Sequence, residues 1–329
     1  MIAQTIPTGA AVAEAIVQGY ALGDLQYCEL LRSGFNHVFR LKFVDGRRAI
    51  ARLSDHRPRG APNSDYEAAF LHHLRNAKIE VAASIPTRDN SAAIQLNLPE
   101  GPRTLMLFEH LDGETPDTLP DIEATGRGLA LLHEAGTTYK GPTSRYVLDL
   151  PFLLDASIER ICAISTADDA LRASFIAIGQ RLTARIAAIP NLTYVTCHGD
   201  CHGDNNFMTE DKDGARVPSF FDFDDAGPGL LSYELSVFLW SMWPGKVEMP
   251  LEDFNLENWR AFLKGYRSVR ALESNDFDAI APFISVRQFW LMGEYAGRIS
   301  VWGTETISTS YLQKQVNRFL AWESLTTPS

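Results

Sequence analysis

Alternating hydrophobic and polar positions in the first hundred residues predict a small region built from β-strands. The hydrophobic residues recur with a period of two, which is typical of strands with one buried face. Five such runs lie at residues 26–33, 37–43, 49–53, 94–98 and 103–108. Asp45-Gly46, between the second and third runs, is a strong hairpin-turn signal. We therefore expect five strands in this part of the chain.

A helical period appears first at residues 64–76 and dominates the chain after residue 121. In the first of these segments Tyr66, Phe70 and Leu74 fall on one side of the predicted helix. The later helical runs are residues 122–134, 153–164, 171–189, 231–243, 259–269, 280–302 and 311–325. Two short β runs, 194–197 and 219–223, interrupt them. This segregation predicts an α+β fold with a small, mainly β N-terminal part and a larger, mainly α C-terminal part.

The composition is that of a packed globular enzyme, because 45% of the 329 residues are hydrophobic and 22% are charged. No span of ~20 apolar residues is present to cross a membrane, and the N-terminus lacks the features of a signal peptide. The four cysteines form no C-x-x-C pair, so we expect reduced thiols in a cytoplasmic protein. A net charge of −11 disfavours nucleic acid as a partner and would suit a cationic small molecule.

The most informative part of the chain is a polar run followed by a second acidic run. Residues 198–205 read HGDCHGDN and residues 219–225 read SFFDFDD. An aspartate, an asparagine five positions later and an aspartate after an apolar strand form the set that kinase-fold enzymes use. Phosphoryl transfer requires an aligned acceptor oxygen and neutralised phosphate charge. We therefore expect Asp200 to be the catalytic base, and Asn205 and Asp222 to hold Mg²⁺, which prefers oxygen ligands.

The residues of the polar run by themselves also allow two other interpretations. Positions 198, 200, 202 and 204 alternate between histidine and aspartate, as the ligands of a di-metal hydrolase would on an extended segment. Such a site needs further histidines, and none follows His202. The second alternative is a polar turn without chemistry. Because thiols and imidazoles are poor ligands for Mg²⁺, we leave them out of the metal site and expect His198 to hold the loop by a hydrogen bond.

These motifs resemble the aminoglycoside phosphotransferase-like kinases, a family also similar to choline, homoserine and methylthioribose kinases and to bacterial stress-response kinases. Its members carry H-G-D-x-H-x-x-N, an apolar strand and D-[FWL]-D, and this sequence matches every fixed position. The resemblance implies a two-lobed protein-kinase-like fold: a nucleotide-binding lobe (1–108), a hinge and linker (109–120), and a catalytic and acceptor-binding lobe (121–329). Gly199 replaces the arginine of H-R-D kinases, and the short stretch from Asp222 to Tyr233 indicates that no extended activation loop is present.

The resemblance also implies nucleotide contacts in the first lobe. The turn containing Ser33, Gly34 and Asn36 would fold over the triphosphate, although an ordinary hairpin turn has the same signal. Arg52 stands where the kinase fold places the lysine of its third strand. Its guanidinium is suited to bidentate pairing with phosphate oxygens, and the alternative is a solvated arginine on an edge strand.

Glu67 has two candidate roles. The family implies an ion pair with Arg52, whereas Ser64-Asp65-Tyr66-Glu67 also has the pattern of a capping box, in which Glu67 would bond the backbone of Ser64. We favour the ion pair. Glu109 and Leu111 lie in the segment that offers backbone groups to the adenine edge in this family, and a plain interdomain linker would have the same composition.

The sequence thus predicts a phosphotransferase that uses Mg²⁺ to move the γ-phosphoryl group of ATP or GTP to a hydroxyl of a small molecule. A protein Ser/Thr kinase of the bacterial stress-response type is the alternative, and the intact motif residues disfavour a silent nucleotide-binding module. No motif indicates the acceptor, the oligomeric state, or the roles of Asp224 and Asp225. We expect the aromatic residues of the last helices, Trp290 among them, to belong to the core.

Overall fold

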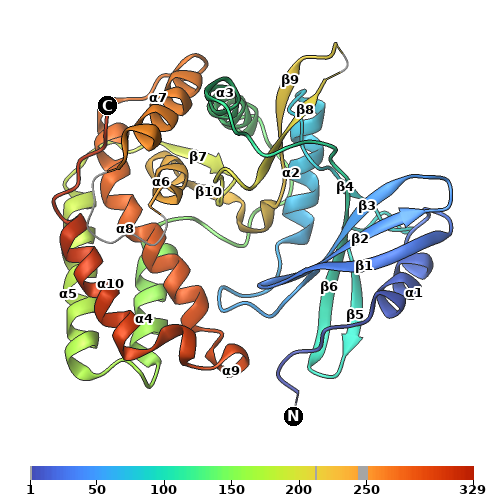
Figure 1. The fold of residues 1–329 in the computed structure, drawn as a ribbon, viewed down its shortest axis with the longest axis horizontal. Helices are drawn as coiled ribbons and strands as arrows, with labels where there is room; N and C mark the ends of the chain where they lie inside the picture. Colours follow the sequence, from blue (N-terminus) through green and yellow to red (C-terminus); the bar gives the residue numbers. More distant parts are fainter. Residues whose placement is uncertain (1, 212, 244–250) are drawn as a thin grey trace. The chain divides into compact units, whose positions relative to one another are not determined.

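The computed structural model describes residues 2–211, 213–243 and 251–329 (Figure 1). The chain divides into two compact units. Met1–Asp112 with Tyr139–Thr143 forms the N-terminal unit, and Gly113–Thr138 with Ser144–Ser329 forms the C-terminal unit. The first is built on an antiparallel sheet and the second is mainly helical, so the predicted α+β class is confirmed. Among the described residues, no helix combines the length and the apolar character needed to cross a bilayer.

Within residues 2–112, six strands form the antiparallel sheet. They are β1 (Leu25–Ser33), β2 (Asn36–Phe43), β3 (Arg48–Ser54), β4 (Ser84–Ile85), β5 (Ile94–Leu98) and β6 (Gly101–Glu109). Their order is β1-β2-β3-β6-β4, and β5 also pairs with β6. All five predicted strands are present. The expected count of five was nevertheless wrong, because β4 has only two residues and cannot show an alternating pattern.

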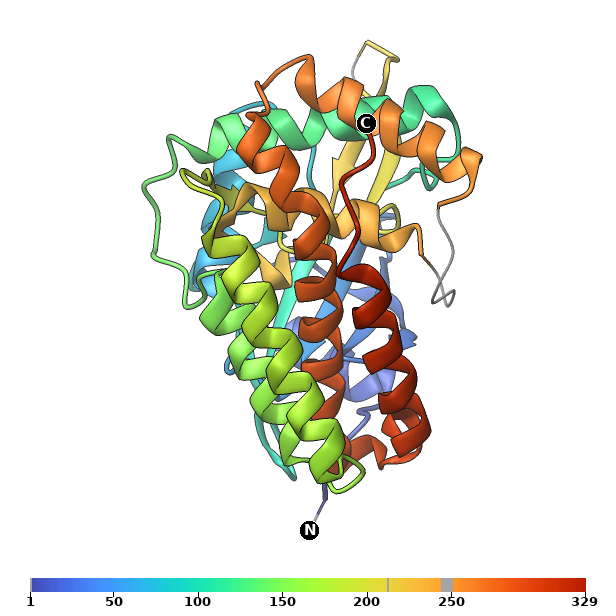
Figure 2. The ribbon, with the colours of Figure 1, turned by 90° about the vertical axis from the view of Figure 1, so that its left-hand side faces the viewer.

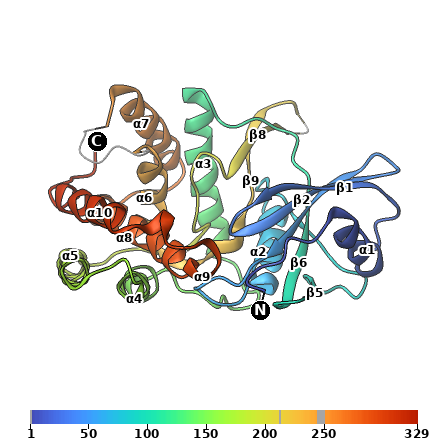
Figure 3. The ribbon, with the colours of Figure 1, turned by 60° about the horizontal axis from the view of Figure 1, so that its bottom comes forward.

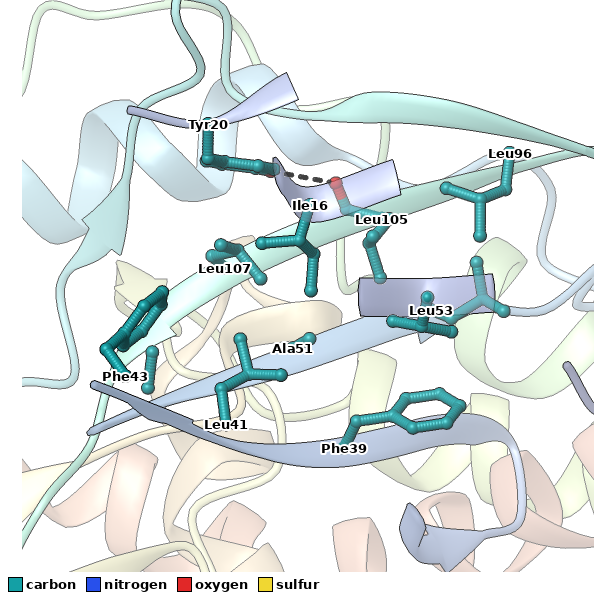
Figure 4. Close-up of a cluster of buried hydrophobic side chains, with 12 residues drawn as sticks. Ile16, Tyr20, Phe39, Leu41, Phe43, Ala51, Leu53, Leu96, Leu105 and Leu107 are labelled. Atoms are coloured by element: carbon teal, nitrogen blue, oxygen red, sulfur yellow. Dashed lines mark hydrogen bonds between the residues drawn. The ribbon is translucent and has the colours of Figure 1, made fainter. Parts of the chain in front are cut away.

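A helix that we did not predict, α1 (Gly9–Gly19), contributes to the core of this unit. Figure 4 shows Ile16 of α1 and Tyr20, the residue that follows α1, with Phe39 and Leu41 of β2, all of them buried. The Tyr20 hydroxyl donates to the Leu105 carbonyl oxygen at 3.1 Å, so its polar end is satisfied as well. Burying each such apolar side chain contributes about 1.5–3 kcal/mol, which fixes the sheet as a rigid support.

The helix α2 (Ser64–Asn76) lies where the hydrophobic period placed it, and its residues Phe70 and Leu74 are buried. Tyr139 packs edge-on against Phe70 with ring centroids 5.3 Å apart. This aromatic contact explains why the short segment Tyr139–Thr143 belongs to the N-terminal unit although it is distant in sequence.

Helices make up most of the C-terminal unit. They are α3 (Leu119–Gly136), α4 (Ala156–Ala163), α5 (Asp169–Ala187), α6 (Leu231–Ser241), α7 (Asp253–Arg267), α8 (Ser274–Ala296), α9 (Ile299–Trp302) and α10 (Thr309–Trp322), with single turns η1 (Pro151–Asp155), η2 (Phe223–Asp225) and η3 (Glu305–Ile307). Figures 2 and 3 show α4, α5, α8 and α10 side by side. The run predicted as one helix over 280–302 is two, since α8 ends at Ala296.

Two glycines allow α3 and α7 to approach closely. A Cβ atom at Gly126 would lie 2.0 Å from the carbonyl oxygen of Phe262, and one at Gly265 would lie 1.8 Å from that of Glu123. No side chain fits at either distance. The close crossing fixes α3, and with it His133, in the unit that carries the catalytic motif.

Four short strands frame that motif. β7 (Tyr194–Cys197) pairs with β10 (Gly227–Leu230), and β8 (Asn206–Glu210) pairs with β9 (Arg216–Phe220). The predicted runs 194–197 and 219–223 therefore do not pair with each other, and the second is a strand only as far as Phe220, where β9 ends. The partner β10 was missed because Gly-Pro-Gly-Leu lacks the residues that favour strands.

Candidate active site

The loop that carries Asp200 begins where β7 ends, and a buried carboxylate holds its first residues. Glu234, on α6, accepts hydrogen bonds from the backbone N–H groups of His198 at 2.8 Å and Gly199 at 3.0 Å. The Glu234 side chain is 0% exposed, so these charge-assisted bonds are not weakened by competing water. The first turn of α6 therefore fixes the backbone that leads to Asp200.

The charge of Glu234 is itself compensated. Burial alone would raise the pKa of this carboxyl, but its favourable interactions with His133, His198 and the Gly199 N–H outweigh burial, and its pKa lies below the ordinary value. The Nε2 atom of His133 is 3.8 Å from the carboxylate, and its Nδ1 atom pairs with the Tyr266 hydroxyl at 2.8 Å. His133 is thus a buried histidine that Tyr266 holds beside Glu234.

Gly199 is required by the backbone of this loop. Its φ of +87° lies in the region that side-chain-bearing residues rarely adopt, and a Cβ there would lie 2.2 Å from the carbonyl oxygen of Asp225. An arginine, as in the H-R-D motif, does not fit this position. Glycine at position 199 therefore permits the close packing of the loop against Asp225.

His198 has the structural role that we expected. Its Nδ1 atom accepts the Asp200 N–H at 3.3 Å, so Nε2 carries the proton and donates to the Phe221 carbonyl oxygen at 2.9 Å. Burial lowers the pKa of the imidazole, which keeps it in this neutral form. The ring thereby links the loop of Asp200 to the segment that contains Asp222.

Asp200 and Asn205 are brought together. The Asn205 Nδ2 group donates to the Asp200 carbonyl oxygen at 2.8 Å, and the Asn205 carbonyl oxygen accepts the Phe221 N–H at 3.1 Å. The side-chain amide nitrogen is thus engaged within the loop, which leaves the amide oxygen as the atom suited to a hard cation. The Asp200 carboxylate pairs with Arg287 of α8 and is 20% exposed, so other groups can reach it.

Asp222 follows directly, in an unusual backbone conformation. Its φ of +63° and ψ of +57° are left-handed, and the turn η2 begins at the next residue. Asp224 and Asp225 lie in that turn and are buried. Phe221, whose N–H donates to the Asn205 carbonyl oxygen, directly precedes Asp222. Asn205 and Asp222 therefore lie on neighbouring segments of the chain. One amide and one carboxylate oxygen, completed by phosphates and water, form a suitable donor set for Mg²⁺.

The alternative hydrolase site has no support in the described ranges. Among these residues no group of three or more histidine, cysteine, aspartate or glutamate side chains is arranged to hold a metal ion. Burial raises the pKa of both Cys197 and Cys201 well above the ordinary value, with Glu234 adding to the effect. Both therefore remain protonated thiols, which are poor metal ligands.

In the N-terminal unit, Arg52 of β3 pairs with Glu67 of α2. Arg52 Nη1 donates to Glu67 Oε1 at 2.9 Å, and Nη2 contacts Oε2, so the pair is bidentate. Both side chains are buried, which excludes the exposed edge-strand interpretation. The capping-box alternative was also wrong, because the helix starts at Ser64 with Asn63 as its N-cap. The predicted ion pair is confirmed, while contact with a nucleotide stays a prediction.

The remaining predicted nucleotide residues lie at the ends of strands in the same unit. Ser33 ends β1 and Asn36 begins β2, and the Gly34 N–H donates to the Asn36 carbonyl oxygen at 3.1 Å in the turn between them. Glu109 ends β6, and Leu111 follows it, half-buried. The Glu109 N–H donates to the Ala83 carbonyl oxygen at 2.9 Å and is therefore not free for a base.

Sequence reasoning missed two residues at this site, Glu234 and Arg287. Glu234 carries a detectable signal, since it is an acidic residue in the first turn of an otherwise hydrophobic helix. A charge at such a buried position needs a partner. Arg287 lies in an apolar stretch of α8 and offers a similar signal, but its partner is 87 positions away in sequence and cannot be identified by spacing.

A sheet-based unit with a buried arginine–glutamate pair and a helical unit with the H-G-D loop define the kinase-like class of proteins. The amicoumacin kinase hAmiN, solved with AMP-PNP, Ca²⁺ and Ami, has a TM-score of 0.74 at 18% identity and covers 97% of this chain and 94% of its own. The microcompartment-associated aminopropanol kinase has a TM-score of 0.70 at 21% identity, with 95% of each chain covered. The predicted protein-kinase-like fold is confirmed.

Sequence comparison gives the family. The profile of the phosphotransferase enzyme family matches residues 28–272. An uncharacterized protein of Deinococcus radiodurans is 33% identical over 297 residues, covering 89% of this chain and 84% of the relative. A homoserine kinase of Hyphomonas neptunium is 28% identical over 299 residues, covering 87% and 85%. The chain therefore belongs to the phosphotransferase enzyme family, and the prediction of a kinase is confirmed.

Proposed function

We propose that this enzyme transfers the γ-phosphoryl group of ATP to a hydroxyl of a small molecule, with Asp200 as the base. The observation that carries the proposal is the fixed geometry of the catalytic loop. Glu234 holds its first two N–H groups, and Asn205 closes it onto the Asp200 carbonyl. The partly exposed Asp200 carboxylate would accept the hydrogen bond of the acceptor hydroxyl, align its oxygen and take its proton.

On the nucleotide side, the proposal assigns phosphate contacts to Arg52 and to the turn that contains Ser33, Gly34 and Asn36. Glu67 would hold the Arg52 guanidinium in a fixed orientation through its two contacts. Backbone groups of Glu109 and Leu111, other than the Glu109 N–H, would contact the adenine edge.

Asn205 and Asp222 would hold Mg²⁺ through one amide and one carboxylate oxygen. When bound, the ion supplies positive charge that compensates the phosphate oxygens during transfer. The left-handed Asp222 and the bond between Phe221 and Asn205 support this pairing, because they fix the two residues on neighbouring segments. The nearby thiols of Cys197 and Cys201 are protonated and the His198 ring is hydrogen-bonded, so they would not compete for the ion.

For the acceptor, we propose a small hydroxyl compound that carries an amino group. Relatives and structural neighbours include proteins named homoserine kinase, aminopropanol kinase and ethanolamine kinase, each naming a compound with both groups. The net charge of −11 suits an amine, since a negative protein raises the local concentration of cations.

Labelled nucleotide supplied with a panel of amino alcohols, hydroxy amino acids, aminoglycosides, sugars and mixed proteins tests the proposal. The protein should be active as purified from a host without protein kinases, since no extended activation loop separates Asp222 from α6. The expected result is label on at least one soluble hydroxyl compound. Label found only on protein serine or threonine would overturn the proposal in favour of a protein kinase.

A further inference from the structure

One buried arginine contacts the proposed base directly. The Nη2 group of Arg287, on α8, pairs with Oδ1 of Asp200, and the Arg287 side chain is only 3% exposed. The other carboxylate oxygen, Oδ2, lies 3.7 Å from His202 Nε2. The two oxygens of Asp200 therefore have different surroundings: one is paired with a buried guanidinium and the other is next to a partly exposed imidazole.

The guanidinium of Arg287 is held between two indole rings. Its central carbon lies 5.0 Å from the ring centroid of Trp240 and 4.5 Å from that of Trp290. Trp290 is buried as expected, and Trp240 is fixed in turn by a 2.9 Å bond from its Nε1 to Gln288. A flat, delocalised cation stacks well on aromatic faces, whereas an ammonium group does not fill the same space.

Tyr233 lies in the same surroundings. Burial raises the pKa of its hydroxyl, and the nearby positive charge of Arg287 acts in the opposite direction. That hydroxyl lies 3.5 Å from the Gly199 carbonyl oxygen, next to Asp200 in the chain. An arginine that only filled the space between two indoles would not need its contact with Asp200.

An ion pair with a buried arginine and a partly exposed carboxylate is a poor source of stability, because desolvating the charges costs about as much as their attraction returns. Its better-supported use is to specify one geometry. We propose that Arg287 is a positioning residue that fixes the rotation of the Asp200 carboxylate, so that Oδ2 is presented to the acceptor hydroxyl. This inference rests on the proposed function, in which Asp200 meets that hydroxyl.

The test compares Arg287→Met, Arg287→Lys and Arg287→Ala with Arg318→Met. Arg318 is the matched control, because it is also buried and its guanidinium stacks on an indole, that of Trp322 at 5.5 Å, within α10. With an acceptor found in the compound panel, Arg287→Met should lower kcat on the order of 10²-fold with little change in the KM for nucleotide. Arg318→Met should leave kcat unchanged.

Restoring activity with an added small cation distinguishes a positioning role of Arg287 from a role in packing alone. Added ethylguanidinium should restore part of the kcat of Arg287→Ala, while ethylammonium should not, since only the planar cation fits between the two indoles. Arg287→Lys should recover less than a tenth of the wild-type kcat for the same reason. A folded Arg287→Met enzyme with wild-type kcat, or equal rescue by both amines, would overturn the proposal.

A measurement without turnover keeps this inference distinct from the proposed function. Urea unfolding of wild type, Arg287→Met, Asp200→Asn and the double variant gives the coupling between the two side chains. Non-additive effects are expected, and additive effects would show that the pair does not fix Asp200. If the pair is coupled but no compound in the panel is phosphorylated, the proposed function fails while the structural link between Arg287 and Asp200 stands.

Discussion

At Asp222 the backbone adopts a left-handed conformation, which aspartate and asparagine tolerate better than most residues. An alanine variant at this position would combine the loss of a ligand with backbone strain of about 1–2 kcal/mol. Asparagine preserves the conformation and one oxygen while removing the charge. It is therefore the sharper probe of metal binding.

Asp222→Asn should weaken the Mg²⁺-dependent part of nucleotide binding about tenfold or more, because one charged ligand of the ion is lost. Calorimetry with nucleotide, with and without Mg²⁺, measures this. Asp204→Asn is the matched control, since Asp204 lies in the catalytic loop but its side chain is 86% exposed. Wild-type metal dependence in Asp222→Asn would show that the ion is held elsewhere.

The roles of the site residues could be predicted from the sequence to different extents. Asp200, Asn205 and Asp222 are recognisable because phosphoryl transfer fixes both their chemical types and their spacing. The choice between two roles for Glu67 required the structure, because a capping box and an ion pair use the same residue types. The role of Arg287 could not be predicted from the sequence, since only the folded chain places this residue next to Asp200.

Among the elements, α6 connects the catalytic loop to the core of the C-terminal unit. Its residue Glu234 pairs with two consecutive backbone N–H groups, which only a carboxylate can do with both of its oxygens. In Glu234→Gln the amide NH₂ would face one of those donors and leave a buried N–H unpaired. We expect a loss of about 1–3 kcal/mol in the free energy of unfolding, together with lower kcat.

The same variant should change how stability depends on pH. The folded pKa of Glu234 lies below its ordinary value of 4.5, so the carboxylate contributes stability that is fully present above pH 4.5 and is lost as the pH falls through the folded pKa. Urea unfolding should therefore show wild type and Glu234→Gln converging as the pH is lowered.

Asp276→Asn provides the comparison at another buried carboxylate. Asp276 accepts bonds from the N–H and hydroxyl of Thr193 at 2.8 and 2.6 Å, so it holds the chain before β7 rather than the catalytic loop. This variant should lose stability and keep its kcat. A pH-independent difference between wild type and Glu234→Gln would contradict the role given to Glu234.

Long elements with a clear period were predictable, whereas short ones were not. The strands of the N-terminal sheet and α2 follow from the spacing of their hydrophobic residues. The strands β4 and β10 are formed by pairing with longer neighbours, so their own residues carry little signal. The helix α1 had a readable start, since the Thr8 side chain caps it, but we did not interpret that segment.

At the scale of the whole molecule, fold and family are consistent with one another. The phosphotransferase profile and the motif of residues 198–205 give the class of reaction, and the kinase-like fold is consistent with both. The acceptor does not follow from them. We expect side chains of the C-terminal helices to recognise it, and there the spacing of hydrophobic residues indicates the core and not the ligand.

The central claim is that Asp200 aligns the acceptor hydroxyl and takes its proton, and the turnover of Asp200→Asn tests it most directly. With the acceptor identified in the compound panel, the variant should lose on the order of 10²–10⁴ in kcat, because it retains the shape of the side chain but cannot accept the proton. Its affinity for nucleotide, measured by calorimetry, should change little. Turnover equal to that of the wild type would contradict the account.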